Sequence, residues 1–352
     1  MAEPHRIRVD APGGAYDIFI EPGLRRRIRA RITGFALGER LVVGANPTLM
    51  SLYGQDLAAD LPNAAVVTMP DGEQYKTLAT TAQLYVDFVR EGLDRSGTVI
   101  ALGGGVVGDT VGFAAATYMR GVRLVQMPTS LLAMVDSSVG GKVGVDIPEG
   151  KNLVGAFKQP AVVLIDTDVL DTLPEREWRC GMAELIKHGL LADALLLDMA
   201  AHSQTVDRAE LVCRAIQVKV DVVTEDPYER GIRAHLNLGH TFAHAIERVT
   251  HYGWLHGEAV AVGLVAAARL SYALGLADAA LPGQVESILT TVGLPVRLGD
   301  LDAEQLYAAM GTDKKWQSGK SRFVLLRGVG HAEIVNDVPK AAVIEVLEGM
   351  KA

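Results

Sequence analysis

The feature that most restricts the fold is a series of short apolar runs in the first half of the chain, separated by turn signals and helical stretches. The runs predicted to be strands are residues 41–45, 65–69, 97–102, 123–127 and 161–165. They are continuously apolar, which is typical of parallel strands buried on both faces. Strands that alternate with helices predict an α/β domain with a parallel, Rossmann-like sheet. Residues 16–20 are predicted as an antiparallel edge strand.

The pattern changes after residue 173, because Pro174 is followed by Glu-, Ala- and Leu-rich segments with helical spacing. Helices are predicted at residues 175–202, 207–223, 241–249, 257–274, 283–291 and 340–350, with one hairpin at 323–326 and 332–335. The chain has 352 residues, more than a usual single domain. We therefore expect an α/β domain of residues 1–172 and a mainly α-helical domain of residues 173–352, with the active site in the interdomain cleft.

Charge and composition argue against several classes of protein. The net charge of −8 disfavours a nucleic-acid partner, which usually requires a basic surface. No apolar run of about 18 residues predicts a membrane span, and residues 1–10 lack the features of a secretory signal. Cys180 and Cys213 are too few for a disulfide framework. We therefore expect a cytoplasmic protein that binds neither membranes nor nucleic acid.

A cluster of arginines is the main basic run of the chain. It comprises Arg25, Arg26, Arg27, Arg29 and Arg31. Because no aromatic residues are interleaved with them, we interpret these arginines as the solvated face of a short helix.

A glycine-rich loop follows the predicted strand at 97–102. Gly103, Gly105 and Gly108 have G-x-G-x-x-G spacing, and residues 109–118 read as helical. Glycines let the backbone approach a pyrophosphate, whose charge the amino end of the following helix favours. The next strand, however, ends in Pro128 and Thr129 instead of the acidic residue that would bind a ribose. The loop predicts a phosphate cradle in a protein that is not a plain Rossmann dehydrogenase.

Histidines and carboxylates are concentrated in the second half. His240 and His244 stand one helical turn apart on the same face. Potential further ligands are Cys180, Glu184, His188, His251 and His256. A single histidine is more often structural, but a cluster with a carboxylate suits a catalytic zinc site that keeps one position open. Spacing alone favours His240 and His244 as a metal pair and leaves the third ligand open.

Several cations lie in glycine-rich or otherwise interrupted segments of this acidic chain. They are Arg120, Lys142, Lys151 and Arg233, and Lys187, Lys219, Lys314 and Lys315 add to them. Any one of them is expected to be a solvated surface charge. If several converged, they would form an anion site for phosphate or carboxylate groups.

Taken together, these motifs resemble the 3-dehydroquinate synthase family from end to end. The shared segments are D-G-E-Q-Y-K (71–76), G-G-G-V-V-G-D (103–109), M-R-G-V (119–122), P-T-S-L-L-A-M-V-D-S-S-V-G-G-K (128–142), G-K-N-L-V-G-A-F (150–157), G-M-A-E-L-I-K-H-G (181–189), L-N-L-G-H-T-F-A-H-A-I-E (236–247), L-H-G-E (255–258) and D-K-K (313–315). One departure is Ala243, where the family commonly has glycine.

The resemblance implies a specific set of site residues. The implied ligands of a divalent metal, zinc or cobalt, are Glu184, His240 and His256, and His244 moves to the substrate side. The implied NAD contacts are Asn46, Asp71, Gly72, Glu73, Gln74, Tyr75, Lys76, Gly105, Val106, Val107, Gly108, Asp109, Thr129, Ser130, Lys142, Lys151, Val169, Leu170, Asp171 and Thr172. The implied substrate contacts are Arg120, Asp136, Lys142, Asn152, Lys187, Lys219, Arg233, Asn237 and His244, with Lys314 or Lys315 for phosphate. Lys142, Asn152, Arg233 and His244 are the implied catalytic residues.

The resemblance also implies a reaction and an assembly. A homodimer would convert 3-deoxy-D-arabino-heptulosonate 7-phosphate, a sugar-acid phosphate, to 3-dehydroquinate and phosphate with catalytic NAD, the second step of the shikimate pathway. Glu229 and Glu258 are candidates for orienting the metal ligands. The alternatives are another sugar phosphate cyclase, a metal-dependent NAD polyol dehydrogenase, and an NAD-binding paralogue without activity.

Overall fold

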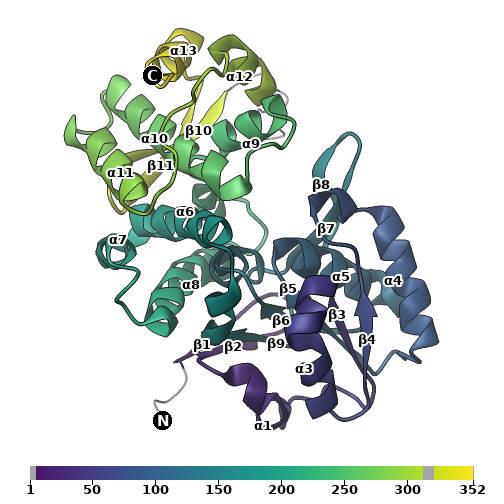
Figure 1. The fold of residues 1–352 in the computed structure, drawn as a ribbon. Helices are drawn as coiled ribbons and strands as arrows, with labels where there is room; N and C mark the ends of the chain where they lie inside the picture. Colours follow the sequence, from purple (N-terminus) through teal and green to yellow (C-terminus); the bar gives the residue numbers. More distant parts are fainter. Residues whose placement is uncertain (1–4, 312–320, 352) are drawn as a thin grey trace. The chain divides into compact units, whose positions relative to one another are not determined.

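The computed structural model describes residues 5–311 and 321–351 (Figure 1). By its internal contacts the chain forms two units. Unit 1 comprises Met1–Leu173 and Arg208–Val220, and unit 2 comprises Pro174–Asp207 and Asp221–Ala352. Within the described ranges, no helix combines the length and the apolar character needed to cross a membrane.

Unit 1 is built on a seven-stranded sheet with the order β1-β2-β9-β6-β5-β3-β4. The strands are β1 (His5–Val9), β2 (Tyr16–Glu21), β3 (Leu41–Ala45), β4 (Ala64–Thr68), β5 (Thr98–Gly103), β6 (Arg123–Pro128) and β9 (Val162–Asp166). All neighbouring pairs are parallel except β1 and β2. The predicted parallel sheet is therefore confirmed, with strand ends shifted by a residue at most.

Two predictions about unit 1 were wrong or incomplete. Residues 16–20 were expected at the edge, but β2 lies between β1 and β9 and is parallel to β9. The edge strand on this side of the sheet is β1, whose sequence H-R-I-R-V buries only Ile7 and Val9 and so gives a weak apolar signal. A glycine-rich hairpin of β7 (Lys142–Ile147) and β8 (Gly150–Phe157) was also not predicted.

Helices α4 (Leu78–Arg90) and α5 (Gly105–Thr117) cover part of the sheet in unit 1. Their buried residues, including Leu84, Phe88 and Val111, share one hydrophobic core with strand residues such as Val42 and Val99. The shorter helical elements are η1 (Leu24–Arg27), α1 (Ile28–Ile32), α2 (Pro47–Leu49), η2 (Met50–Gly54) and α3 (Gln55–Asp60). The arginine run thus falls on short helices as predicted. Arg26, Arg27 and Arg29 are exposed as expected of a solvated face, whereas Arg25 and Arg31 pair with the buried carboxylates of Asp166 and Glu21.

Unit 2 is mainly helical. Its elements are α6 (Glu175–Ala192), α7 (Ala194–Ala201), α9 (His240–Val249), α10 (His256–Ala273), α11 (Ala280–Thr291), α12 (Ala303–Met310), α13 (Lys340–Glu348) and the hairpin β10 (Arg322–Gly328) with β11 (His331–Asn336). Residues 208–220 of α8 (Arg208–Glu225) group with unit 1. The single helix predicted at 175–202 was wrong, because Asp193 leaves helical geometry and its side chain caps α7 at the Leu195 amide, 3.1 Å away. Helix α12 was not predicted.

Candidate active site

Three potential metal ligands of unit 2 lie together although they come from separate segments. Glu184 lies within α6, and His240 and His256 are the first residues of α9 and α10. The Oε1 atom of Glu184 is 3.3 Å from His240 Nε2 and 3.2 Å from His256 Nε2. One donor atom from each residue lies within 4.8 Å of the others. The geometry therefore groups His240 with His256 and Glu184.

Glycine contacts between helices bring these ligands together. A Cβ atom at Gly257, next to His256, would lie 2.3 Å from the Cα and carbonyl oxygen of Cys180, one turn before Glu184 on α6. A Cβ atom at Gly263 of α10 would lie 2.2 Å from the carbonyl oxygen of Gly239, which precedes His240. Backbones this close tolerate no side chain, so both glycines are required for the approach of α10 to its neighbours.

Each ligand is oriented by a second contact. His240 Nδ1 donates to the carbonyl oxygen of Leu238 at 3.1 Å, which leaves Nε2 to face Glu184. His256 Nδ1 lies 3.4 Å from Glu247 Oε1, and Lys187 Nζ lies 2.5 Å from Glu184 Oε2. Such contacts fix the ring orientation and tautomer of metal-binding histidines. They direct the Nε2 atoms and Oε1 toward one point.

The charges of the cluster favour a cation at this point. Burial would raise the pKa of Glu184, but Lys187 and His240 outweigh it and hold that pKa well below its usual range. Burial lowers the pKa of His240 to about 4, whereas hydrogen bonds to Glu184 and Glu247 overcome burial and raise the pKa of His256 to about 10. The hydrogen bond from His240 Nδ1 to the Leu238 carbonyl oxygen leaves the Nε2 lone pair facing the Glu184 carboxylate. Two acceptors 3.3 Å apart are favourable only with a cation between them.

The donor set therefore fits a divalent metal. Two imidazoles and one carboxylate suit catalytic zinc, which takes three protein ligands and keeps a fourth position open. His244 lies one turn along α9, with its ring edge-on to His240 and 5.6 Å between the ring centroids. Among the described residues, the three-donor group at this point contains His256 in place of His244.

The predicted NAD residues of unit 1 follow the carboxyl ends of the parallel strands. Asn46 follows β3, the glycine loop follows β5, and Thr129 follows β6. The segments 71–76 and 169–172 come after β4 and β9. The strand order changes direction between β3 and β5, since β4 lies on one side of β3 and the later strands on the other. Ligands of open α/β sheets bind at such a switch point, outside the carboxyl ends.

The glycine loop forms a tight turn from β5 into α5. A Cβ atom at Gly103 would lie 2.4 Å from Val107 Cβ, so this position accepts no side chain. Gly105, Val106, Val107, Gly108 and Asp109 form the first turn of α5, a helix of 13 residues. Gly104 and Gly105 come near the neighbouring loop, where a Cβ atom on each would lie 3.4 Å from Ser130 Oγ and Ser137 Oγ. The turn leaves backbone amides at the helix start, which suits a phosphate group.

Other predicted NAD residues are connected by polar contacts. Asn46 donates to Asp71 Oδ1 at 2.8 Å and accepts from the Leu49 amide at 2.8 Å. The buried Lys76 ammonium lies 2.6 Å from Asp109 Oδ2 and donates to Asn152 Oδ1 at 2.7 Å. Lys151 Nζ lies 3.1 Å from Glu73 Oε1. These contacts tie the loops after β3, β4 and β5 and the β7–β8 hairpin to one another.

The predicted substrate residues of unit 1 include two in left-handed backbone conformations. Arg120 is exposed with φ of 65° and Asn152 has φ of 53°, conformations that cost free energy and are common at functional sites. Asp136 forms an ion pair with the buried Lys219, whose Nζ atom lies 2.9 Å from Asp136 Oδ1. Lys142 is exposed at the start of β7.

Two of the predicted substrate residues of unit 2, Lys187 and Arg233, are buried. Lys187 pairs with Glu184, and Arg233 Nη1 donates to the carbonyl oxygen of Pro227 at 2.6 Å. Asn237 Nδ2 donates to Glu229 Oε1 at 3.1 Å. The two remaining predictions, Lys314 and Lys315, lie outside the described residues.

Two models of one enzyme family match this chain. The model described as 3-dehydroquinate synthase N-terminal matches residues 66–180, and the model described as 3-dehydroquinate synthase C-terminal matches residues 181–316. The chain belongs to the 3-dehydroquinate synthase family. The 3-dehydroquinate synthase of Nostoc punctiforme is 43% identical over 359 residues, which cover 98% of this chain and 99% of that protein. The chain thus belongs to a family of enzymes and matches this relative over nearly its whole length.

Solved structures of sugar phosphate cyclases have the same fold. The 2-epi-5-epi-valiolone synthase of Streptomyces hygroscopicus, with NAD+ and Zn2+ bound, is 30% identical with a TM-score of 0.88 and covers 98% of this chain and 99% of its own. A 2-deoxy-scyllo-inosose synthase complexed with carbaglucose-6-phosphate, NAD+ and Co2+ is 25% identical with a TM-score of 0.89 and covers 98% and 100%.

Sequence reasoning missed one residue beside the candidate metal ligands. Glu247 contacts His256, whereas the sequence argument had considered Glu258 and Glu229 for that role. The Glu258 carboxylate instead accepts from Arg176 at 2.7 Å and from the Leu255 amide at the start of α10. A signal for Glu247 was available, because it lies seven residues after His240 and hence on the same face of α9.

Proposed function

We propose that this chain converts 3-deoxy-D-arabino-heptulosonate 7-phosphate to 3-dehydroquinate and phosphate, as a carbon–oxygen lyase that uses NAD and a divalent metal, zinc or cobalt. The observation that carries the proposal is the cluster of the buried Glu184 with the half-buried His240 and His256 in a chain of this family. Bound NAD+ with Zn2+ or Co2+ in the related cyclases supports the choice of cofactors.

Each cofactor has a set of residues that would hold it. Glu184, His240 and His256 would bind the metal, and the glycine loop with the segments after β3, β4, β6 and β9 would bind NAD. When bound, the metal would polarise substrate hydroxyl groups and NAD would accept and return a hydride. The protein itself contributes binding, orientation and charge.

The cations account for the recognition of a substrate with a carboxylate and a phosphate. The Arg233 backbone amide donates to Asp226 Oδ2 at 3.1 Å and its guanidinium donates to Pro227, so this buried side chain has a fixed direction. A planar guanidinium binds carboxylate and phosphate groups through paired hydrogen bonds. We assign the substrate carboxylate to Arg233 and the phosphate to lysines and Arg120.

Two side chains are proposed to move protons. His244 is half-buried beside His240, and Asn152 is exposed and contacts Lys76. A histidine titrates near neutral pH and can pass a proton to water, while the asparagine amide can hold that water. We assign the relay to His244 and the positioning of the water to Asn152.

A second candidate function is a cyclase with another sugar phosphate substrate. The similarity to 2-deoxy-scyllo-inosose and 2-epi-5-epi-valiolone synthases favours it, because both share the fold at TM-scores of 0.89 and 0.88. Glucose 6-phosphate and sedoheptulose 7-phosphate lack a carboxylate, so Arg233 would have no anionic partner on them. Higher activity on either sugar than on the heptulosonate phosphate would favour this alternative.

The test follows phosphate release from the three sugar phosphates with zinc and substoichiometric NAD. We expect phosphate and 3-dehydroquinate from the heptulosonate phosphate alone, without accumulation of NADH. A polyol dehydrogenase would instead accumulate NADH. Glu184→Ala and His256→Ala should lose bound metal and activity together, and full activity after extensive chelation would contradict the proposal.

We also propose, from family membership, that the protein is a cytoplasmic homodimer. Light scattering at several concentrations measures the assembly directly. A monomeric mass in an active preparation would contradict the dimer.

A further inference from the structure

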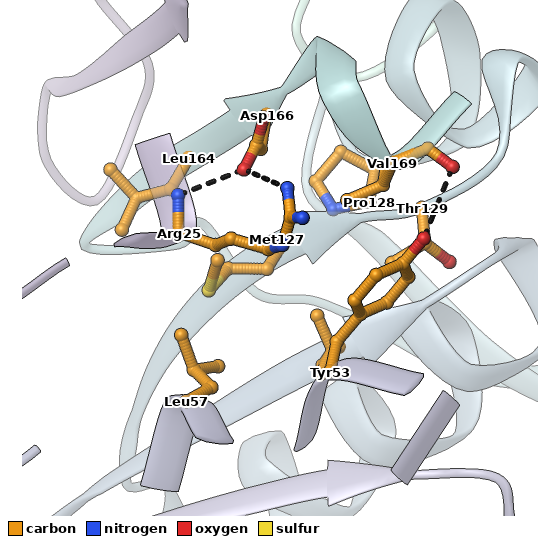
Figure 2. A pocket seen from close by; sticks show the side chains of 10 residues that line it. Arg25, Tyr53, Leu57, Met127, Pro128, Thr129, Leu164, Asp166 and Val169 are labelled. Carbon is orange, nitrogen blue, oxygen red and sulfur yellow. Dashed lines mark hydrogen bonds and ion pairs between the residues drawn. The ribbon is translucent and has the colours of Figure 1, made fainter. Parts of the chain in front are cut away.

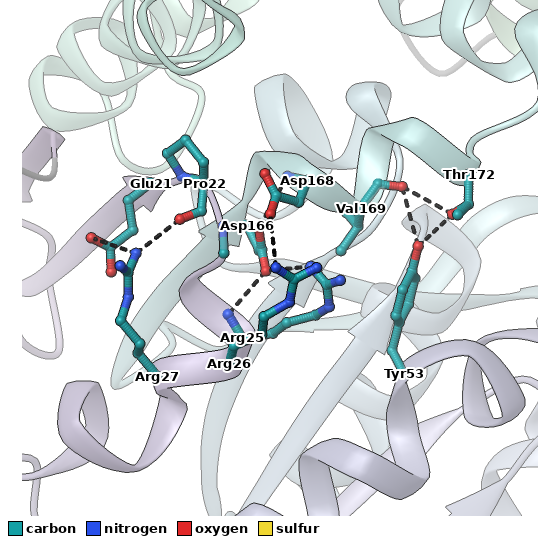
Figure 3. A network of polar contacts seen from close by, with 11 residues as sticks. Glu21, Pro22, Arg25, Arg26, Arg27, Tyr53, Asp166, Asp168, Val169 and Thr172 are labelled. Carbon is teal, nitrogen blue, oxygen red and sulfur yellow. Dashed lines mark hydrogen bonds and ion pairs between the residues drawn. The ribbon is translucent and has the colours of Figure 1, made fainter. Parts of the chain in front are cut away.

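A buried tyrosine of unit 1 lies on an irregular helical turn that follows β3. The chain is helical from Pro47 to Asp60, with a π-helical turn at Met50–Gly54 that contains Tyr53. The Met50 thioether packs against Gly54 in this turn, where a Cβ atom would lie 2.5 Å from Met50 Sδ. Single π-turns are rare and are frequent at functional sites. The Tyr53 side chain is only 7% exposed, and it points toward the loop after β9 (Figure 3).

The Tyr53 hydroxyl is hydrogen-bonded to the hydroxyl of Thr172 (Figure 3). Thr172 Oγ1 also donates to the carbonyl oxygen of Val169 at 3.1 Å, whereas the Tyr53 oxygen is 3.5 Å from that carbonyl. If each hydroxyl donates along its shorter contact, Tyr53 donates to the Thr172 hydroxyl and Thr172 donates to the Val169 carbonyl oxygen. A hydroxyl has one proton and two lone pairs. Thr172 therefore keeps one lone pair, and because Thr172 is exposed, a ligand can reach it.

Arg25 packs against the ring of Tyr53. Its guanidinium lies 5.0 Å from the centre of the Tyr53 ring, and its Nη1 atom is 2.8 Å from Asp166 Oδ2. Asp166 is 2% exposed and also accepts from the Gly23 amide at 2.7 Å and the Arg25 amide at 3.0 Å. A charge held this firmly fixes the ring plane, and cation–π attraction adds to it. Arg25 is thus a structural cation, contrary to its interpretation as part of a solvated face.

The space around this arrangement is too small for a ligand. A cavity of about 10 Å³ lies among Arg25, Tyr53, Leu57, Met127, Thr129 and Val169 (Figure 2). A single water molecule needs about this much room. The cofactor cannot enter it, so any effect of Tyr53 on the cofactor must pass through a neighbouring residue.

We propose that Tyr53 is a positioning residue for Thr172, and that Arg25 holds the Tyr53 ring so that the Thr172 hydroxyl accepts a hydrogen bond from a ribose hydroxyl of NAD. The inference rests on the proposed function, because it takes Thr172 as a cofactor contact. Thr172 ends the segment that follows β9, at the sheet edge where ligands of this fold bind. The helix that carries Tyr53 begins after Asn46, another proposed NAD contact, so one helix supports two loops at this edge.

The first test is Tyr53→Phe, which removes the hydroxyl and keeps the ring. We expect the Kd of NAD, measured by calorimetry on the metal-loaded protein, to rise about two- to tenfold, the range of one lost hydrogen bond. The kcat at saturating NAD should not change, because the residue does not contact reacting atoms. Tyr85→Phe is the matched control: the Tyr85 hydroxyl also bonds a threonine, Thr117 Oγ1 at 2.6 Å, at the far end of α5 from the glycine loop. It should leave the Kd unchanged.

A double variant separates positioning from a general loss of structure. Thr172→Val should weaken NAD binding at least as much as Tyr53→Phe, and the double variant should be no weaker than Thr172→Val alone, because Tyr53 acts through Thr172. An unchanged Kd in Tyr53→Phe, an equal loss in Tyr85→Phe, or additive losses in the double variant would overturn the inference. Wild-type protein that binds no NAD would overturn the proposed function instead.

Discussion

Gly257→Ala tests whether contact between helix backbones sets the metal site. The added methyl group would lie 2.3 Å from the backbone of Cys180, whereas ordinary contact begins near 3.4 Å. Both neighbours are backbone atoms in helices, so a side-chain rotation cannot relieve the clash. Helices α6 and α10 would have to separate by about 1 Å, the difference between those two distances.

The separation acts directly on the ligands. His256 is adjacent to Gly257, and Glu184 lies one turn after Cys180, so the 3.2 Å distance between their donor atoms must change. Overpacking of a tight contact lowers the free energy of unfolding by about 1–3 kcal/mol. The higher helix propensity of alanine relative to glycine offsets up to about 1 kcal/mol of this loss. Metal sites tolerate ligand shifts of only about 0.2 Å, so we expect the zinc affinity to fall by about 10- to 100-fold.

The assay is competition for zinc with a chelator, together with urea unfolding of the metal-free protein. Gly283→Ala is the matched control, because Gly283 lies in α11 of the same unit and a Cβ atom there would meet no atom within 4 Å. The control should bind zinc like the wild type and be equally stable or slightly more so. Wild-type zinc affinity in Gly257→Ala would refute the reasoning.

Three further predictions concern charge and metal. Glu247→Gln should weaken zinc binding by about 10- to 100-fold, because His256 loses the carboxylate that orients it; chelator competition measures this, and unchanged affinity would contradict the role of Glu247. Removal of the metal should lower the thermal unfolding midpoint, and zinc in excess of its Kd should restore it, whereas a midpoint independent of zinc would count against a native site. Burial would raise the pKa of Glu286, but hydrogen bonds from Arg269 and Arg297 lower it from 4.5, so its contribution to stability is present above pH 4.5 and is lost as the pH falls through the lower, folded-state pKa. Glu286→Gln should reduce that acid dependence in urea titrations, and an identical pH profile would disprove it.

The candidate ligands show what the spacing of residues within one helix can and cannot predict. His240 and His244 are one turn apart, so spacing alone favours them as a pair, yet the donor group near His240 contains His256 and Glu184. Those residues are joined to it by long-range contacts of Gly257 and Gly263, which periodicity cannot register. The resemblance to a known family named the same three residues as candidate ligands, because motif matches carry information about contacts that spacing does not.

The arginine run shows the same limit in unit 1. Its composition correctly predicts short helices, since nothing in the local pattern opposes them. Its contacts depend on Glu21 and Asp166, carboxylates that end strands β2 and β9. An arginine in such a run is solvated only if no buried carboxylate lies within reach of its guanidinium. Which carboxylates lie within reach depends on the order of the strands in the sheet.

The sequence by itself determined the parallel sheet and the helical second half, and it supplied the candidate metal ligands. Short, continuously apolar runs are typical of strands that are buried on both faces of a sheet, and each run can be recognised from its own residues. Tertiary structure alone decided which strand lies beyond β2 at the edge of the sheet, and that Tyr53 reaches Thr172. Each of these depends on atoms distant in the chain whose approach is set by close contacts between whole elements, and no pattern within a single element records it.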